Sequence, residues 1–186
     1  MTLATLLRRV ITILDEAEIP YMLTGSLAAA YYAIPRATQD IDIVVEAMPT
    51  QLGTLTRLLA SAGLYVSSEA AREASVCEGQ FNAIDPETGW KVDFILRKSR
   101  PFSASEFGRR TLKAALGLEF FMATPEDLVI AKVEWAMKGE SDLQLRDVRA
   151  LLRTAGPEFE WSYVEHWIKE LGLEAQWQAV HPDNIQ

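Results

Sequence analysis

The sequence predicts an α/β fold, of the α+β kind, with a mixed sheet flanked by helices and a helical C-terminal part. Segments rich in β-branched and aromatic residues, such as 40–46 and 90–96, alternate with helical patterns in the first two thirds of the chain. From residue 124 onward only helical patterns follow. Strands mixed with helices, followed by helices alone, predict an α/β core over 1–123 and a helical region over 124–186 packed on it.

The first half of the predicted core alternates helix and strand. Apolar residues at helical spacing, strand-type composition and turn residues mark its elements. Gly25 and Ser26 turn the first strand into an alanine-rich helix, which ends before Pro35 because the residue preceding a proline is pushed out of the α region. The expected elements are helices over 2–16, 27–33 and 49–63 and strands over 21–24 and 40–46.

The second half of the chain begins with hairpins and ends with helices. Two strand-like segments flank the turn sequence at 85–89, and Gly117 divides a second expected hairpin. Residues 64–79 are ambiguous between a strand followed by a helical turn and an exposed loop. The remaining expected elements are strands over 80–84 and 90–96, a hairpin over 111–124, and helices over 124–138, 141–154 and 159–180.

Composition bounds the class of protein. The 186 residues are 49% apolar and 24% charged, which is ordinary globular composition. A net charge of −8 disfavours a broad electrostatic grip on nucleic acid, although it leaves room for a local basic groove, and an acidic site suits a cationic acceptor. The sequence has no apolar run of about 18 residues, no signal peptide pattern and only one cysteine, Cys77. We therefore expect a cytoplasmic protein that has no membrane partner.

Three aspartates are candidates for a metal site. Side chains alternate across a strand, so Asp40 and Asp42 share one face, and Asp93 lies on a later strand that alternates in the same way. Carboxylate oxygens are ligands that Mg²⁺ prefers, and two such ions activate an attacking hydroxyl and stabilise the leaving oxygen. The alternative is a solvated strand face. The third carboxylate favours a cluster that binds metal and carries the catalysis.

Gly25 and Ser26 are candidates for phosphate binding. Glycine lets the backbone approach a ligand closely, and a serine that opens a helix presents its hydroxyl beside unpaired backbone N–H groups. An ordinary helix cap after a tight turn would use the same two residues. Their combination with the Asp40-Ile-Asp42 pair and Asp93 favours one site for a triphosphate and magnesium.

This order of motifs resembles the polymerase-beta-type nucleotidyltransferase superfamily, and within it the AbiEii-like, toxin-type nucleotidyltransferases. The resemblance spans roughly residues 20–152. Its motifs are Gly25-Ser26, Pro35-Arg36-Ala-Thr38-Gln-Asp40-Ile-Asp42, Asp93, Thr124-Pro125-Glu126-Asp127-Leu128 and Lys132. The resemblance implies a nucleotidyltransferase fold and Mg²⁺-dependent transfer of a nucleoside monophosphate from an NTP, such as ATP, to an acceptor hydroxyl. Two metal ions are expected, with Mn²⁺ as a substitute.

The resemblance also assigns roles to residues. Asp40, Asp42 and Asp93 would bind metal, and Asp93 would help to deprotonate the acceptor. Residues that would contact the nucleotide are Gly25, Ser26, Arg36, Thr38 and Lys132. Lys132 has no acidic residue three or four positions away, so it is either a triphosphate ligand or a lysine that reaches solvent. Arg36 either clamps a phosphate or pairs with an acid that holds its loop.

Other catalytic classes find little support in the sequence. It contains no P-loop, Ser26 is not part of a Gly-x-Ser-x-Gly elbow, and His166 and His181 lack metal-ligand spacing. The prediction is therefore a nucleotidyltransferase whose acceptor is RNA such as tRNA, a protein or a small molecule, with an antitoxin protein as a further expected partner. The alternatives are a nucleotide-binding module without turnover and an antibiotic-type nucleotidyltransferase.

Overall fold

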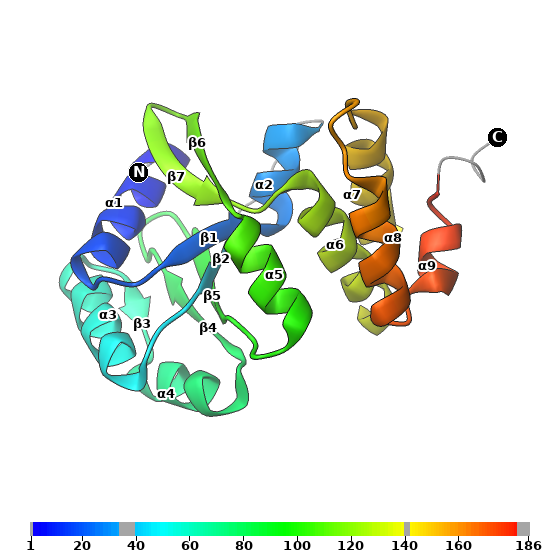
Figure 1. The fold of residues 1–186 in the computed structure, drawn as a ribbon. Helices are drawn as coiled ribbons and strands as arrows, with labels where there is room; N and C mark the ends of the chain where they lie inside the picture. The colour runs from blue at the N-terminus through cyan, green and yellow to red at the C-terminus, as the bar shows by residue number, and fades with distance from the viewer. Residues whose placement is uncertain (1, 34–39, 140–141, 182–186) are drawn as a thin grey trace. The chain divides into compact units, whose positions relative to one another are not determined.

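The computed structural model describes residues 2–33, 40–139 and 142–181. Its strands are β1 (Tyr21–Thr24), β2 (Asp40–Val45), β3 (Tyr65–Val66), β4 (Gln80–Ile84), β5 (Lys91–Leu96), β6 (Thr111–Ala115) and β7 (Leu118–Met122). Its helices are α1 (Leu3–Glu16), α2 (Gly25–Tyr32), α3 (Pro49–Ser61), α4 (Ser68–Cys77), α5 (Pro101–Arg109), α6 (Pro125–Gly139), α7 (Asp142–Arg153), α8 (Trp161–Glu170) and α9 (Glu174–Gln178). The predicted α/β class with a mixed sheet is confirmed (Figure 1).

The described strands form one seven-stranded sheet in the order β3-β4-β5-β2-β1-β7-β6. Neighbours β2 and β5 are parallel, as are β1 and β7, and the other pairs are antiparallel. Both predicted hairpins are present. The second turns through Leu116 and Gly117, with φ of 55° and 68°, values that a two-residue hairpin turn with the twist of the strands requires.

One face of the sheet builds the core of this part of the chain. The residues that point to it from β2 and β5 are at most 5% exposed, and they are Ile41, Ile43, Val45, Val92, Phe94 and Leu96. Helices α1, α3 and α4 pack side by side, and α4 contacts β4. Because strand side chains alternate, Asp40, Asp42, Lys91 and Asp93 lie on the opposite face. The predicted division of β5 into an apolar and a polar face is confirmed.

The chain divides into two compact units: residues 1–27 and 37–122 form the first, and residues 28–36 and 123–186 form the second, so the first boundary falls inside α2. The first unit holds the whole sheet and α1, α3, α4 and α5. In the second unit, α7, α8 and α9 each contact α6, around a core that includes Ile130, Val133 and Val164. None of the described helices has the length and apolar character that crossing a bilayer requires.

Three segments differ from the sequence-based expectation. Helix α5 was not predicted; Arg100 precedes it and Pro101 occupies its first turn. The ambiguous segment 64–79 forms the short strand β3 and the full helix α4, whose cap Ser67 accepts the backbone N–H of Ala70. The expected helix over 159–180 is wrong as a continuous element, because α8 ends before Gly172, which has a φ of 66°.

Candidate functional site

A row of paired polar residues crosses the face of the sheet opposite its apolar face. Asp42 on β2 lies directly opposite Thr24 on β1 and directly opposite Asp93 on β5. Asp93 in turn lies opposite Asn82 on β4. Residues paired in adjacent strands point to the same face. The register therefore brings together two of the three predicted carboxylates, although they lie 51 positions apart in the chain.

The third carboxylate, Asp40, lies two positions before Asp42 and is paired with Lys91. The Lys91 ammonium is 2.9 Å from Asp93 Oδ2 and 3.5 Å from Asp40 Oδ1, so it bridges the two acids. The side chain of Asp93 is only 12% exposed, that of Lys91 is 35% exposed and that of Asp40 is 50% exposed. The hydrogen bond to Asp93 raises the pKa of Lys91 above its usual value, against the opposing effect of burial.

Gly25 lies against the same row. Its φ is 65°, and a Cβ atom added there would be 1.9 Å from Asp42 Oδ2. Only glycine therefore fits beside this carboxylate in this backbone conformation. Gly25 also begins α2, so that Ser26 occupies the first turn of a helix directly beside the carboxylate row. Unpaired backbone N–H groups in a first turn favour an anion.

The carboxylates provide the type of ligand that magnesium prefers, but they are not arranged as a finished metal site. Three hard oxygen donors on one sheet face, beside a glycine that allows close approach, fit a divalent ion chemically. Among the described residues, however, no three His, Cys, Asp or Glu side chains are grouped so that they could hold one. The cation that lies between Asp40 and Asp93 is the ammonium of Lys91.

The other predicted nucleotide ligands are Arg36, Thr38 and Lys132, and none of them belongs to the described residues of the first unit. Arg36 and Thr38 lie outside the described residues. Lys132 belongs to the second unit, where it is 4% exposed and donates to Asp147 Oδ2 at 2.8 Å and Gln144 Oε1 at 3.0 Å. It therefore does not reach into solvent. Its contact with a triphosphate stays a prediction.

The Thr124-to-Asp127 motif starts helix α6, as its sequence predicted. The Thr124 hydroxyl accepts the backbone N–H of Asp127 at 3.3 Å and bonds the Asp127 carboxylate at 2.7 Å. The other oxygen of that carboxylate accepts the Tyr163 hydroxyl at 2.7 Å, which ties α6 to α8. Glu126 accepts the backbone N–H of Glu160 at 3.2 Å. Within the second unit this motif anchors a helix.

Sequence reasoning did not assign a site role to Lys91, Thr24 or Asn82. The alternation along 90–96 did place Lys91 on the face of Asp93, and that was the one available signal. Its bridge to Asp40 depends on the parallel register of β2 and β5. The row from Thr24 to Asn82 depends likewise on pairing across four strands.

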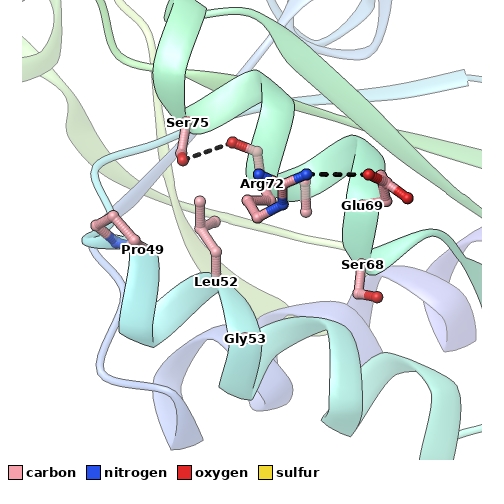
Figure 2. Close-up of a pocket in the computed structure, with 8 residues that line it drawn as sticks. Pro49, Leu52, Gly53, Ser68, Glu69, Arg72 and Ser75 are labelled. Carbon is pink, nitrogen blue, oxygen red and sulfur yellow. Dashed lines mark hydrogen bonds and ion pairs between the residues drawn. The ribbon is translucent and has the colours of Figure 1, made fainter.

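A hollow of about 470 Å³ lies elsewhere in the first unit, between α3 and α4. On its α4 side, Figure 2 shows Glu69 and Arg72 beside each other, paired at 2.9 Å, and Ser75 donating to the Arg72 carbonyl at 2.8 Å. Both members of the ion pair are largely exposed. None of the three aspartates lines this hollow, and its charged groups are neutralised within α4. It does not contribute to the site.

Comparisons with known proteins bear on the fold. No protein-family model matches the chain, and no curated protein sequence matches it. The structure is similar to that of ANT(2'')-Ia in complex with adenylyl-2''-tobramycin, with a TM-score of 0.63, 15% identity, and coverage of 95% of this chain and 99% of that chain. It is also similar to the lincosamide antibiotic adenylyltransferase LnuA bound to lincomycin, with a TM-score of 0.54, 12% identity, and coverage of 80% and 96%.

A third similar structure is an antigenic nucleotidyltransferase-like protein from Paracoccidioides brasiliensis, with a TM-score of 0.57, 16% identity, and coverage of 92% and 94%. The chain therefore has the fold of nucleotidyltransferases. At these identities the likeness concerns the fold, and an activity has to be argued from the site.

Proposed function

We propose that the protein is a nucleotidyltransferase that moves a nucleoside monophosphate from an NTP to an acceptor hydroxyl. The observation that carries the proposal is the register that pairs Asp42 with Asp93 and sets Gly25 against Asp42, within a nucleotidyltransferase fold. An apolar face alone would have sufficed to build the sheet. Carboxylates gathered on the other face are costly to keep together unless cations compensate them.

In the proposed reaction the acceptor oxygen forms a bond to the α-phosphorus, and the bond from that phosphorus to the bridging oxygen of the β-phosphate breaks. Pyrophosphate leaves, and Asp93 accepts the proton of the acceptor hydroxyl. Asp40, Asp42 and Asp93 would hold magnesium, which when bound stabilises charge on the phosphates as a Lewis acid. The first turn of α2, with Gly25 and Ser26, would bind the outer phosphates through its N–H groups.

The acceptor is left open between three classes. An RNA or protein acceptor, and with it an antitoxin, is what the resemblance of the sequence to AbiEii-like nucleotidyltransferases implies. A small-molecule acceptor is supported by the fold neighbours, one solved with an adenylylated tobramycin and one with lincomycin. The net charge of −8 agrees with a cationic small acceptor more easily than with RNA.

The test offers the protein each α-labelled NTP with Mg²⁺ and separate pools of tRNA, protein, aminoglycoside and lincosamide. We expect label in one pool, and a loss of about 10²–10³-fold with Asp42→Asn, because a metal-binding carboxylate supplies several kcal/mol of stabilisation. Glu69→Gln is the matched control, since Glu69 lies on α4, is exposed and is not part of the row. It should transfer label like the wild type.

Two outcomes would overturn the proposal. Equal transfer by the wild type and Asp42→Asn would remove the carboxylates from the mechanism. Nucleotide binding in a thermal-shift series with ATP, CTP, GTP and UTP, without transfer to any pool, would instead favour a nucleotide-binding module that lacks turnover.

A further inference from the structure

Lys91 lies among the three aspartates, and the proposed reaction gives it no role. It begins β5, and its pairing with Asp40 places its side chain on the face of the acids. Its ammonium is within 3.5 Å of both Asp93 and Asp40. A positive charge carried by the chain itself therefore lies where the proposed function requires a metal ion.

The ammonium and a metal ion would use the same oxygen atoms. Asp93 Oδ2 accepts Lys91 at 2.9 Å, and Asp40 Oδ1 faces it at 3.5 Å. Magnesium coordinates such oxygens at about 2.1 Å, a distance that leaves no room for a donor on the same side of the oxygen. The two cations also repel each other. Bridging by Lys91 and coordination of a metal by both acids therefore exclude one another.

Lys91 is free to leave without a large penalty. Its side chain is 35% exposed, and its ammonium sits on a flexible four-carbon stem, so it can reach water while β5 stays in place. Asp93, in contrast, is only 12% exposed, and a positive charge beside a largely buried carboxylate offsets the cost of taking it out of water. The cluster therefore has a counter-ion that is always available but exchangeable.

We propose that Lys91 is a tethered counter-ion that neutralises Asp40 and Asp93 in the absence of metal and competes with the divalent ion for both carboxylates. The lysine thereby sets the metal concentration at which the site fills. This inference rests on the proposed function, because it takes the three aspartates as the metal ligands. The site would then contain, besides the residues that bind metal or nucleotide, a lysine that controls how fully the metal occupies it.

The experiment uses the electron paramagnetic resonance signal of Mn²⁺ to measure its binding. The proteins compared are the wild type, Lys91→Met, Lys91→Gln, Lys91→Arg and Asp93→Asn. Removing the competing charge should make Lys91→Met bind about 3- to 10-fold more tightly than the wild type, and raising the salt concentration should narrow that difference. Lys91→Arg keeps the charge and should bind much like the wild type. Lys91→Gln is a second neutral variant and should match Lys91→Met.

A second readout is the rise in melting temperature on adding Mg²⁺, which grows with affinity. We expect a larger rise for Lys91→Met than for the wild type. Unchanged or weaker Mn²⁺ binding by both neutral variants, with Asp93→Asn no longer binding, would overturn the role of Lys91 and leave the proposed function standing. Mn²⁺ binding that survives unchanged in Asp93→Asn would overturn both.

Discussion

Two lysines of this chain bridge acidic or amide side chains, and their surroundings differ. Lys91 lies on the polar face of the sheet, with a side chain that is 35% exposed, between Asp40 and Asp93. Lys132 lies between α6 and α7, with a side chain that is 5% exposed, bound to Asp147 and Gln144. Both ammonium groups are 2.8–2.9 Å from a carboxylate oxygen.

The difference shows that exposure, rather than distance, separates an exchangeable pair from a fixed one. A buried charge that loses its partner remains out of water, so the pair is held in place by the cost of breaking it. An exposed charge that loses its partner is hydrated instead. The cluster around Lys91 is therefore suited to exchange its cation, and the cluster around Lys132 is suited to fix two helices.

The largest expected effect is on stability at Lys132. Lys132→Met or Asp147→Asn alone should lower the free energy of unfolding by about 3–5 kcal/mol, because each breaks an ion pair whose lysine is only 5% exposed. Lys91→Met should lower it by less than Lys132→Met does, because Lys91 is partly exposed and Asp40, the second acid of its bridge, is half exposed. Urea denaturation of the purified variants measures all three. The comparison fails if Lys91→Met costs as much as Lys132→Met.

The double variant Lys132→Met with Asp147→Leu is the control for burial, and it should recover most of the lost stability. The two single variants, Lys132→Met and Asp147→Asn, also test the predicted contact between Lys132 and the nucleotide. A triphosphate ligand at Lys132 would make Lys132→Met raise the KM for the NTP beyond any change in Asp147→Asn. Equal KM values would assign Lys132 a structural role alone.

The next effect concerns the close approach of Gly25 to Asp42. Gly25→Ala should lose nucleotidyl transfer, because the added Cβ would be 1.9 Å from Asp42 Oδ2 and would push that carboxylate away. It should also lose about 1–2 kcal/mol of stability, because alanine is strained at this positive φ. Gly63→Ala is the matched control, with a φ of 84° and no atom within 4 Å of the added Cβ. It should lose similar stability and keep its activity. Similar activity in both variants would mean that Asp42 tolerates displacement.

An effect confined to alkaline pH extends the comparison to a neutral buried group. Tyr21 is 5% exposed, and burial, assisted by Asp15, raises its pKa to about 12 from about 10 in the unfolded chain. Its contribution to stability is therefore complete below pH 10 and is lost as the pH rises toward 12. Between pH 9 and 11.5 the wild type should lose about 2 kcal/mol relative to Tyr21→Phe in urea denaturation. A difference that is constant with pH would contradict the shift.

Much of the sheet was predictable because local patterns determine it. Alternation in 40–46 and 90–96 assigned each side chain to a face, and Gly117 marked a hairpin. The register between β2 and β5 was not predictable, because it depends on contacts between segments about 50 residues apart. The sequence therefore indicated which residues share a face with Asp93, and only the structure showed that Lys91 bridges to Asp40.

The predictions for the helical segments were incomplete where contacts between distant residues, rather than local sequence signals, determine the structure. Helix α5 buries Phe102 and Phe107, five positions apart, which is too sparse a pattern to announce a helix. Lys132 has no ionic partner within its own helix, since Asp147 lies 15 residues along the chain on α7. The end of α8 was visible in principle, because Gly172 is a typical residue for a helix end.

The position of β2 in the sheet has a further consequence. It is the fourth of seven strands in spatial order, with three strands on either side. Backbone amides in central strands exchange with solvent last, whereas short edge strands such as β3 open first. The amides that hold Asp42 opposite Asp93 should thus be among the slowest to exchange, so that heating frays the margins of the sheet while the carboxylate row stays assembled until global unfolding.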